Sequence, residues 1–345
     1  MKSYKELALH YSVDRLLPLL CLAVAFQASP LRAHAQANAK SGPLMLVTWF
    51  GPGGIALPEG GDWQPEMLTV YDHVQRPVAQ FKKSKSGLPV SFILFENHSG
   101  KPTAAGCRED AINAIVHSDA KLISRRIDGE TRNAAGQTLA TTSYLLDLNH
   151  GRGPHQHNLF GFAGNAKTCA EIHISGVSEI ASEEAAMKSV LASFQPDLTY
   201  QPKEIDYFRI ASALFKDSPG LAAPYYKSAL AALPADPSVL AMRRITTDQL
   251  VMSLGMSGDL ENSRAVARMA IAADPDYPIN YYNLACADAE QGKAADAKLH
   301  LQQAFDRRAN VLAGESMPDP TKDDSLVKLK QNKEFWGFVT ALPRN

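Results

Sequence analysis

The chain has 345 residues, of which 45% are hydrophobic and 21% are charged, and these proportions are typical of a soluble globular protein with about two domains. Lys and Arg number 35 and Asp and Glu 36, so the formal net charge is -1. A nearly neutral chain without a block of like charge lacks the basic field that binds nucleic acid phosphates, so no nucleic acid partner is expected.

Residues 1–39 have the features of a secretory signal peptide. Lys2, Lys5 and Arg15 give a positively charged start, and "LLPLLCLAVAF" (16–26) is an apolar run that is too short to cross a bilayer of about 30 Å as a helix. Small-residue cleavage sites follow in "AHAQANA" (33–39). We therefore expect an exported protein, periplasmic or extracellular, that is not an integral membrane protein. The alternative is a buried helix of the mature chain.

Residues 40–196 are predicted to form an α+β domain. Strand-like runs, two hairpins and two helices follow one another in the order 43–50, 88–97, a helix over 103–119, a hairpin over 120–130 and 137–149, a hairpin over 157–164 and 167–176, and a helix over 178–195. Antiparallel hairpins with separate helices indicate an antiparallel-sheet sandwich.

Three stretches of this domain carry a family resemblance. They are "GGDW" (60–63), "NLFGFAGNAKTCAEIHISG" (158–176) and the helix end "VLASF" (190–194). Together with the strand pattern, they resemble the PsbP-like sandwich over roughly residues 55–196. The resemblance implies a binding or assembly factor, and it supplies no shared catalytic residues.

The cysteines predict one disulfide. After removal of the signal peptide, Cys107, Cys169 and Cys286 remain, in a compartment that is oxidising. Cys107 begins a helix and Cys169 lies on a strand of the same domain, so we expect these two to pair and Cys286 to be a packing or groove residue. Cys169, Glu171 and His173 share one strand face, which is also compatible with a thiol beside a base. The disulfide is the preferred interpretation, with Glu171 and His173 facing solvent or a covering loop.

A histidine-rich stretch, "NHGRGPHQHN" (149–158), is the one candidate metal site. His150, His155 and His157 could bind zinc with a fourth position open for water, and this underlies an alternative function as a metal-dependent hydrolase. The stretch has glycines and a proline, the HExxH motif is absent, and no adjacent carboxylate is ready to orient a ring. We therefore expect an exposed loop without a physiological metal, with Asp147 and Glu171 as its nearest candidate acidic neighbours.

Other catalytic and cofactor motifs are missing from the sequence. No G-x-S-x-G nucleophile motif, no phosphate loop and no dinucleotide fingerprint occurs. Neither a catalytic residue nor a cofactor is predicted, and the protein is not expected to be an enzyme.

After a short linker, "PDLTYQP" (196–202), a repeat of 34 residues appears. The segment "YYNLACADAEQGKAADAKLHLQQAF" (281–305) resembles the tetratricopeptide repeat, with small or apolar residues at the packing positions of that family. The same positions recur 34 residues earlier, and a third copy over 206–234 fits if the loop between its helices is one residue longer. The resemblance implies an all-α repeat domain over 203–345, with a C-terminal capping helix from the amphipathic tail (317–339).

The resemblance also predicts a partner-binding groove on the first helix of each repeat. Its positions here are Ile245, Asp248, Met252, Met256, Ile279, Tyr282, Cys286 and Glu290. Asp248 and Tyr282 stand where the family's clamp for C-terminal carboxylates has lysine, so that ligand is not expected. A Met- and Tyr-bearing surface instead favours an apolar or extended peptide. The alternative is that these residues pack against the sandwich domain.

The sequence therefore favours an exported, non-enzymatic protein-binding or assembly scaffold that acts through the repeat groove and the sandwich domain. The first alternative is the hydrolase based on the histidine loop. A second is a structural envelope protein without a defined ligand.

Export makes a direct prediction about the mature N-terminus. Signal processing should remove the first thirty or so residues, so that the native protein begins near Gln36. N-terminal sequencing of the protein from its native source measures this. An intact Met1 on cytoplasmic protein would contradict export.

Overall fold

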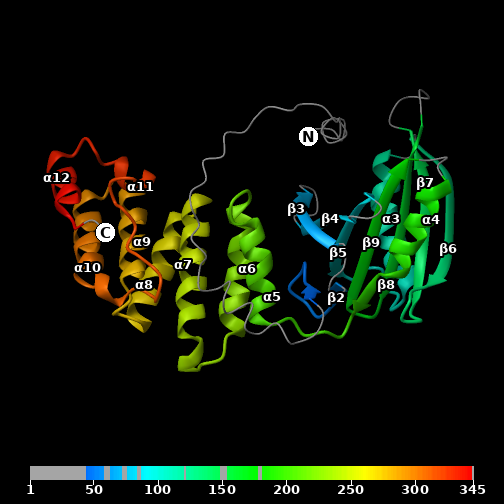
Figure 1. Cartoon of the computed structure of the whole chain (residues 1–345), viewed down its shortest axis with the longest axis horizontal. Coiled ribbons are helices and arrows are strands. Elements are labelled where there is room, and N and C mark those ends of the chain that lie inside the picture. Colours follow the sequence, from blue (N-terminus) through cyan, green and yellow to red (C-terminus); the bar gives the residue numbers. More distant parts are fainter. Residues whose placement is uncertain are drawn as a thin grey trace. The chain divides into compact units, whose positions relative to one another are not determined.

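The computed structural model describes residues 44–57, 63–71, 76–83, 87–119, 122–147, 154–177 and 181–343. These residues belong to two compact units that divide between Pro202 and Lys203. The first unit is built on antiparallel sheets and the second is an array of helices (Figure 1). The predicted fold class, an α+β domain followed by an all-α array, is confirmed.

The first unit contains a seven-stranded antiparallel sheet in the order β3-β4-β5-β9-β8-β7-β6. Its strands are β3 (Trp63–Tyr71), β4 (Arg76–Lys83), β5 (Pro89–Glu96), β6 (Ile123–Arg132), β7 (Thr138–Leu146), β8 (Gln156–Gly164) and β9 (Thr168–Val177). The two predicted hairpins are β6–β7 and β8–β9, which pair directly. Strands β3 and β4 were not predicted, and the register of β3 shifts just after Pro65, because a proline cannot donate to a regular ladder.

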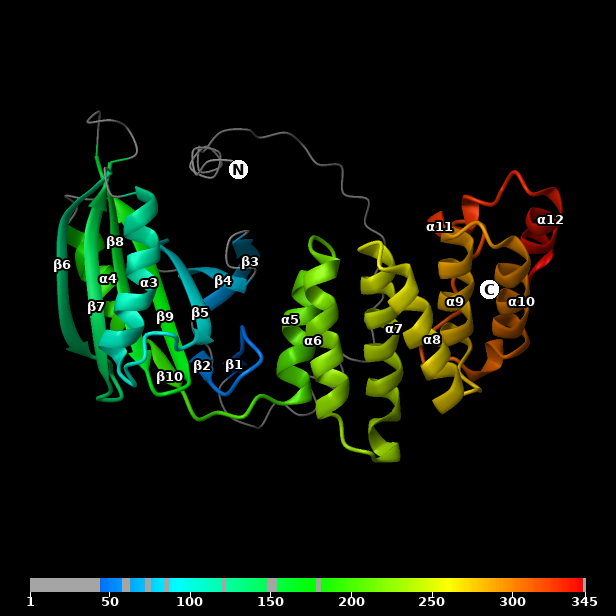
Figure 2. The ribbon, with the colours of Figure 1, turned by 180° about the vertical axis from the view of Figure 1, so that it is seen from behind.

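The two helices of this unit cover opposite faces of the sheet. Helix α3 (Ala104–Asp119) contacts β7, β8 and β9 on one side, and α4 (Ala181–Ala192) contacts β8 and β9 on the other, as the two opposed views show (Figure 1, Figure 2). Alternation along the strands explains both layers. Phe160 and Phe162 pack with Ile112 of α3, whereas a Cβ on Gly161 would meet Leu191 of α4.

A second, three-stranded sheet closes the unit. It consists of β1 (Leu44–Leu46), β2 (Gly54–Leu57) and β10 (Gln195–Asp197), in the order β1-β2-β10. The Thr48 hydroxyl accepts a bond from the Leu94 backbone N–H at 2.7 Å, and the Thr168 hydroxyl donates to the Pro52 carbonyl at 2.8 Å. The predicted linker over 196–202 is corrected at its start, because Pro196 is buried in β10.

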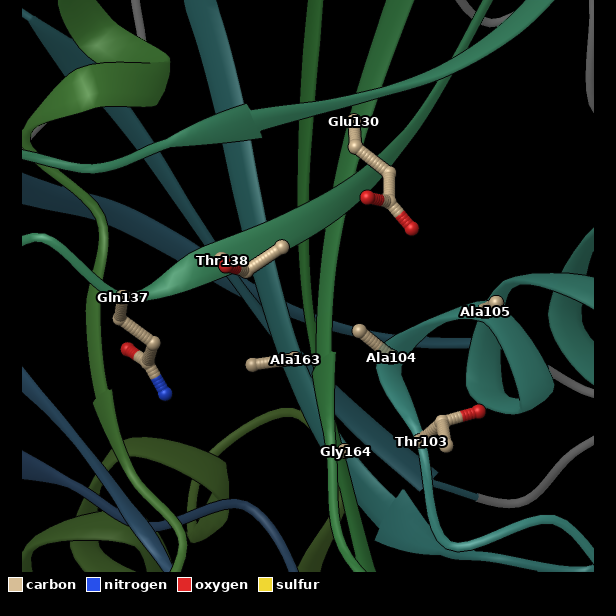
Figure 3. Close-up of a pocket in the computed structure, with 8 residues that line it drawn as sticks. All are labelled: Thr103, Ala104, Ala105, Glu130, Gln137, Thr138, Ala163 and Gly164. Carbon is tan, nitrogen blue, oxygen red and sulfur yellow. The ribbon is translucent and has the colours of Figure 1, made fainter.

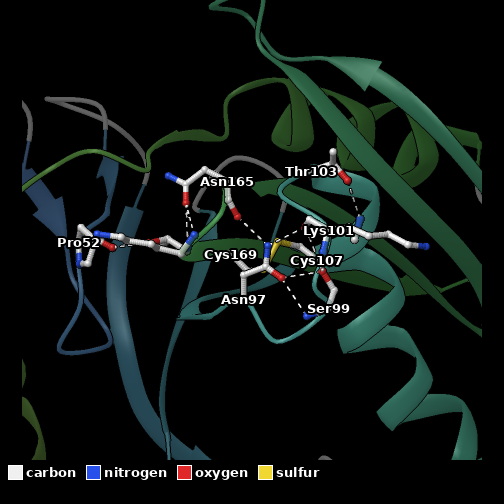
Figure 4. Close-up of a disulfide and its surroundings, with 11 residues drawn as sticks. Pro52, Asn97, Ser99, Lys101, Thr103, Cys107, Asn165 and Cys169 are labelled. Atoms are coloured by element: carbon white, nitrogen blue, oxygen red, sulfur yellow. Dashed lines mark hydrogen bonds between the residues drawn. A yellow bond between two sulfur atoms is a disulfide. The ribbon is translucent and has the colours of Figure 1, made fainter.

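The predicted disulfide joins Cys107 at the start of α3 to Cys169 on β9 (Figure 4). Both residues are fully buried, as expected for a structural bridge between a helix and the sheet beneath it. Next to it, the Asn97 amide donates to the carbonyls of Lys101 and Asn165, at 2.8 and 2.6 Å (Figure 4). These bonds tie the two chain segments that lead to the cysteines.

The second unit consists of three antiparallel helix pairs and a C-terminal segment. The helices are α5 (Glu204–Leu214), α6 (Pro219–Ala232), α7 (Leu240–Met256), α8 (Leu260–Ala273), α9 (Pro278–Glu290), α10 (Ala294–Asp306), α11 (Asp324–Val327) and α12 (Lys333–Ala341). Four residues join α5 to α6, and three residues join the helices in each of the next two pairs, which is the difference of one that the sequence predicts. Gly258 and Gly292, 34 residues apart, take a positive φ of 84° and 71° after α7 and α9, where a side chain would be strained.

Small side chains allow the helices of a pair to pack closely. Ala285, Ala297 and Ala304 are fully buried between α9 and α10. In the preceding pair, the Ser263 hydroxyl donates to the Val251 carbonyl at 3.0 Å, so a polar residue fills the same position without an unsatisfied group. Phe335 and Val339 of α12 belong to the same core as α9 and α10.

The buried bridge predicts a specific loss of stability in the sheet unit. The double change Cys107→Ala and Cys169→Ala removes a cross-link between cysteines 62 residues apart. We expect the free energy of unfolding to fall by about 4 kcal/mol, because the unfolded chain regains the entropy of that loop. Urea unfolding of the oxidised protein measures this. Cys286→Ala is the control and should keep the sensitivity of the melt to reductant, whereas peptide mapping that finds both thiols free would contradict the prediction.

Candidate functional site

The structure divides the predicted groove residues into two groups. On α7, Met252 and Met256 have 38% and 54% of their surface exposed, with Ile245 and Asp248 half-buried on the same helix. On α9, Ile279 and Tyr282 are buried, and Cys286 and Glu290 are half-buried. The same face of the repeat is therefore open on one helix and covered on the next.

The chain's own C-terminal segment covers α9. We call residues 311–328 the C-terminal strap. Its Asp323 carboxylate accepts hydrogen bonds from the Tyr282 hydroxyl at 3.2 Å and from the Cys286 thiol at 3.6 Å, and Lys328 pairs with Glu290 at 2.5 Å. The strap residues Met317 and Leu326 belong to the core of α9 and α10. Three of the four predicted groove residues on α9 thus bind the strap.

The strap also suppresses the reactivity of the free cysteine. Burial raises the pKa of the Cys286 thiol well above its ordinary value, and the neighbouring Asp323 carboxylate adds to this effect. Because the thiolate is the nucleophilic form, Cys286 is unsuited to attack a substrate. Burial, the Cys286 thiol and the Asp323 carboxylate likewise raise the pKa of Tyr282, so its hydroxyl remains a hydrogen-bond donor.

A second carboxylate of the strap is held at the N-terminal end of α9. Glu315 accepts bonds from the Tyr277 hydroxyl at 2.8 and 3.1 Å, and from the Leu312 backbone N–H at 2.9 Å. The Arg244 guanidinium lies 4.5 Å from the centre of the Tyr277 ring. It is bound by Asp274 through two hydrogen bonds, at 2.7 and 3.1 Å.

Asp248 lies between the open and the covered parts of this face. It accepts hydrogen bonds from the Asn283 amide at 2.7 Å and from the Gln249 amide at 3.4 Å. Burial raises its pKa to about 6, and the Glu315 carboxylate contributes in the same direction. Both hydrogen-bond donors are neutral, so the charge of Asp248 is only partly compensated.

One buried ionic cluster between α8, α9 and α10 was not predicted. The fully buried carboxylate of Asp288 pairs with Arg264 at 2.9 Å and with the His300 ring at 2.6 Å, and Arg264 also binds Gln291. Asp288 lies 24 residues after Arg264 and 12 before His300, and these separations produce no local sequence pattern. Only the packed array of helices brings the three side chains together. It fixes adjacent repeats relative to each other, as breaking a buried pair is costly.

In the sheet unit, Cys169, Glu171 and His173 do share one face of β9, as predicted. The expectation that Glu171 and His173 face solvent or a covering loop is corrected. The face is the one that carries α3, and Glu171 and His173 are half-buried on it. The His173 ring stacks on Phe160 at 4.2 Å between centroids and bonds to the Asn158 side-chain oxygen at 2.9 Å.

The burial of these two groups shifts both pKa values toward the neutral forms. Desolvation raises the pKa of Glu171 to about 7 and lowers that of His173 to about 4. Cys169 is already bonded to Cys107, so no thiol beside this pair is free to act as a nucleophile. Glu171 and His173 are therefore interpreted as two polar side chains beside the aromatic core, and not as catalytic groups.

The histidine stretch is described only in part. His150 lies outside the described residues, His155 precedes β8, and His157 is on β8. Among the residues that the structure describes, no group of three or more His, Cys, Asp or Glu side chains is placed to hold a metal ion.

A surface depression lies where the N-terminus of α3 meets β6, β7 and β8 (Figure 3). It is lined by short or neutral side chains and one carboxylate: Thr103, Ala104, Ala105, Glu130, Gln137, Thr138, Ala163 and Gly164. No pair of acid and base converges there. Its lining also lacks large exposed apolar side chains such as Met252 and Met256 on α7.

Comparisons with known proteins return matches among solved structures alone. No protein-family model matches the chain, and no curated protein matches its sequence. Solved structures that match include the Sgt2 TPR domain from Aspergillus fumigatus, at 20% identity over 42% of this chain and 88% of that one, with a TM-score of 0.31. Others are a multi-domain immunophilin from Arabidopsis thaliana (11%, 62% and 93%, TM-score 0.27) and a protein from Bacteroides thetaiotaomicron VPI-5482 (8%, 61% and 77%, TM-score 0.28).

TM-scores this low carry no argument about fold or function. The description of the second unit as a helical array that fits tetratricopeptide repeats rests on its helix pairs, their loops and their small packing residues. Within the part of the chain that the structure describes, no helix is both long and apolar enough to cross a membrane.

The partly compensated charge of Asp248 predicts a pH-dependent penalty. Its folded pKa of about 6 is above the ordinary 3.8, so the folded state binds the proton more tightly and its stability falls as pH rises from about 4 to about 6. Asp248→Asn should remove a penalty on the order of 1–3 kcal/mol at pH 7.5 and raise the melting temperature there. Little change is expected at pH 4. Thermal melts by circular dichroism measure this, with the exposed Asp296→Asn on α10 as control.

An equal effect of Asp248→Asn at both pH values would show that the carboxylate is not the cause. A fall in melting temperature at pH 7.5 would show that its charge is instead well compensated in the fold.

Proposed function

We propose that the protein is an exported, non-enzymatic scaffold that binds a protein partner through the repeat array. In this proposal the first unit is a PsbP-like sandwich, and the second is a tetratricopeptide-repeat domain whose partner lies on α7, the first helix of the middle repeat. The observation that carries the proposal is the pair of exposed thioethers, Met252 and Met256, on a helix whose other side packs into the array.

Several features of the face favour binding over chemistry. Met side chains are flexible and polarizable, so they adapt to apolar groups of different shapes. They are presented by α7, which is fixed by α6, α8 and α9 and therefore loses little freedom when a partner binds. The free thiol of Cys286 on α9 is half-buried and bonded to Asp323, and its pKa is raised, which disfavours the nucleophilic thiolate.

Export is proposed on the sequence of residues 1–39, which lie outside the described residues. The Cys107–Cys169 bridge is compatible with it, since structural disulfides persist in oxidising compartments. The proposed partner is therefore another envelope or extracellular protein. Its identity is to be found by capture.

Capture from an envelope extract tests the proposed surface. Mature protein is immobilised, and captured proteins are quantified by mass spectrometry for the original chain and for Met252→Glu with Met256→Glu. Burying a new carboxylate against an apolar partner group is costly, so we expect at least a tenfold loss of the specific partner. Met269→Glu is the matched control, because Met269 is 71% exposed on α8 and lies outside the predicted groove.

Unchanged capture by the double variant, with a normal melting temperature, would contradict binding at this face. Equal loss in the Met269→Glu control would show a general effect of added charge.

A further inference from the structure

The free helix face on α7 has a polar end and an apolar end. Arg244, Asp248, Met252 and Met256 follow at intervals of four, so they form one row along the helix. Each step along the row is about 6 Å, because the helix rises about 1.5 Å per residue. Because Arg244 is bound to Asp274, a ligand that follows the row from Asp248 onward meets a carboxylate first and the two thioethers next.

The polar end of the row has an excess of negative charge. Among the residues that the structure describes, Asp248 makes no ion pair, and its recorded donors are the neutral amides of Asn283 and Gln249. Arg244 is the basic residue one turn away, but two hydrogen bonds bind it to Asp274 and its plane lies over Tyr277. Glu315 of the strap adds a second carboxylate close enough to raise the pKa of Asp248.

The strap blocks one direction that a ligand could take across the repeats. On one side of α7, the next first helix of a repeat is α9. Its equivalent face is already covered by Asp323, Met317 and Leu326 of the strap. A ligand on Met252 and Met256 that turned toward α9 would meet the strap, whereas a ligand that runs along α7 would not. In an extended peptide, alternate side chains lie on one face about 6.6 Å apart, close to the 6 Å spacing of the row.

We propose that this face binds an extended protein segment with a lysine or arginine followed at alternate positions by two apolar residues. The cation lies beside Asp248 and Glu315, and the apolar side chains lie on Met252 and Met256. This inference rests on the protein-binding function proposed above and specifies the partner's chemistry. A bound cation supplies the compensation that Asp248 lacks, and the burial of two apolar groups supplies the remaining affinity.

Peptide binding followed by NMR tests the inference on the full mature chain. The probe is a blocked peptide, acetyl-SKSLSLS-amide, and its matched control has glutamine in place of lysine. With ¹³C-methyl methionine in the protein, we expect the lysine peptide to shift the signals of Met252 and Met256 and to leave that of Met269 unchanged. The glutamine peptide should bind at least tenfold more weakly.

The variant Asp248→Asn completes the cycle. It should weaken the lysine peptide about tenfold and leave the glutamine peptide unchanged, so that the two peptides become nearly equal. The pH dependence of stability shows separately that this variant is folded.

Two results would overturn the proposal. The lysine peptide failing to shift the Met252 and Met256 signals at millimolar concentration is one, and equal binding of both peptides to the original chain is the other. If either occurs while Met252→Glu with Met256→Glu still abolishes envelope capture, the protein-binding function stands and only the cationic partner is wrong. If capture is also unaffected, the proposed function fails as well.

Discussion

The packing of the C-terminal strap against α9 is the interaction on which the functional surface of the repeat array depends. A helix array that ends abruptly exposes an apolar face, and a terminal element with a polar outer side is needed to cover it. Here Met317 and Leu326 of the strap and Phe335 of α12 enter the core of the last helix pair. The Asp323 carboxylate adds polar contacts to Tyr282 and Cys286, which specify how the strap lies. Stability at this end of the array is therefore achieved at positions that a repeat array otherwise offers to partners.

Because the strap covers α9, the exposed methionines on α7 need a specific explanation. Isolated apolar residues on a surface are common and need no explanation. Met252 and Met256 differ because the equivalent face on α9 is covered by apolar and acidic residues of the same chain. The strap shows that this face accepts side chains in an ordered way, with tyrosine hydroxyls donating to carboxylates. On α7 the polar group of this face is itself a carboxylate, Asp248, so the proposed partner presents a cation there, as Lys328 of the strap does to Glu290 of α9.

Local patterns predicted much of the fold. Alternating apolar residues identified the β6–β7 and β8–β9 hairpins, and the recurrence of small residues at a period of 34 identified the helix pairs of the second unit. Strands β3 and β4 were not predicted, because Pro65 interrupts the pattern of β3 and lysines stand at the end of β4. Strand β10 was not predicted either. It consists of the three residues "QPD", which have the composition of a linker, and it is a strand because it pairs with β2.

For the candidate groove, the sequence names residues but does not predict which of them are accessible. Repeat periodicity places Ile279, Tyr282 and Cys286 on the face of α9 that is equivalent to the face of α7 that carries Met252. The strap that covers them has the sequence "MPDPTKDDS" in its centre, rich in Pro and Asp, which is typical of a solvated connection. Its buried anchors, Met317 and Leu326, are single apolar residues nine positions apart without helical or strand periodicity. The amphipathic tail over 317–339 predicts that this segment caps the array, with Leu326 among its apolar residues, but no local signal shows that it covers the predicted groove on α9.

The same limit applies to electrostatics, and it explains why Asp248 is informative. An aspartate at this position of a helix is ordinary in sequence, because i±4 neighbours usually supply a cation, and Arg244 is such a neighbour. Tertiary packing engages that cation elsewhere, since Asp274 at the C-terminal end of α8 binds it and the Tyr277 ring lies against it. Burial then leaves a carboxylate with only amide donors, next to Glu315 brought in by the strap. Selection for stability alone would favour asparagine there, which would keep the bond from Asn283 without the charge. In the proposal made above, this half-buried carboxylate without a cationic partner among the described residues is explained by a cation on the partner that binds.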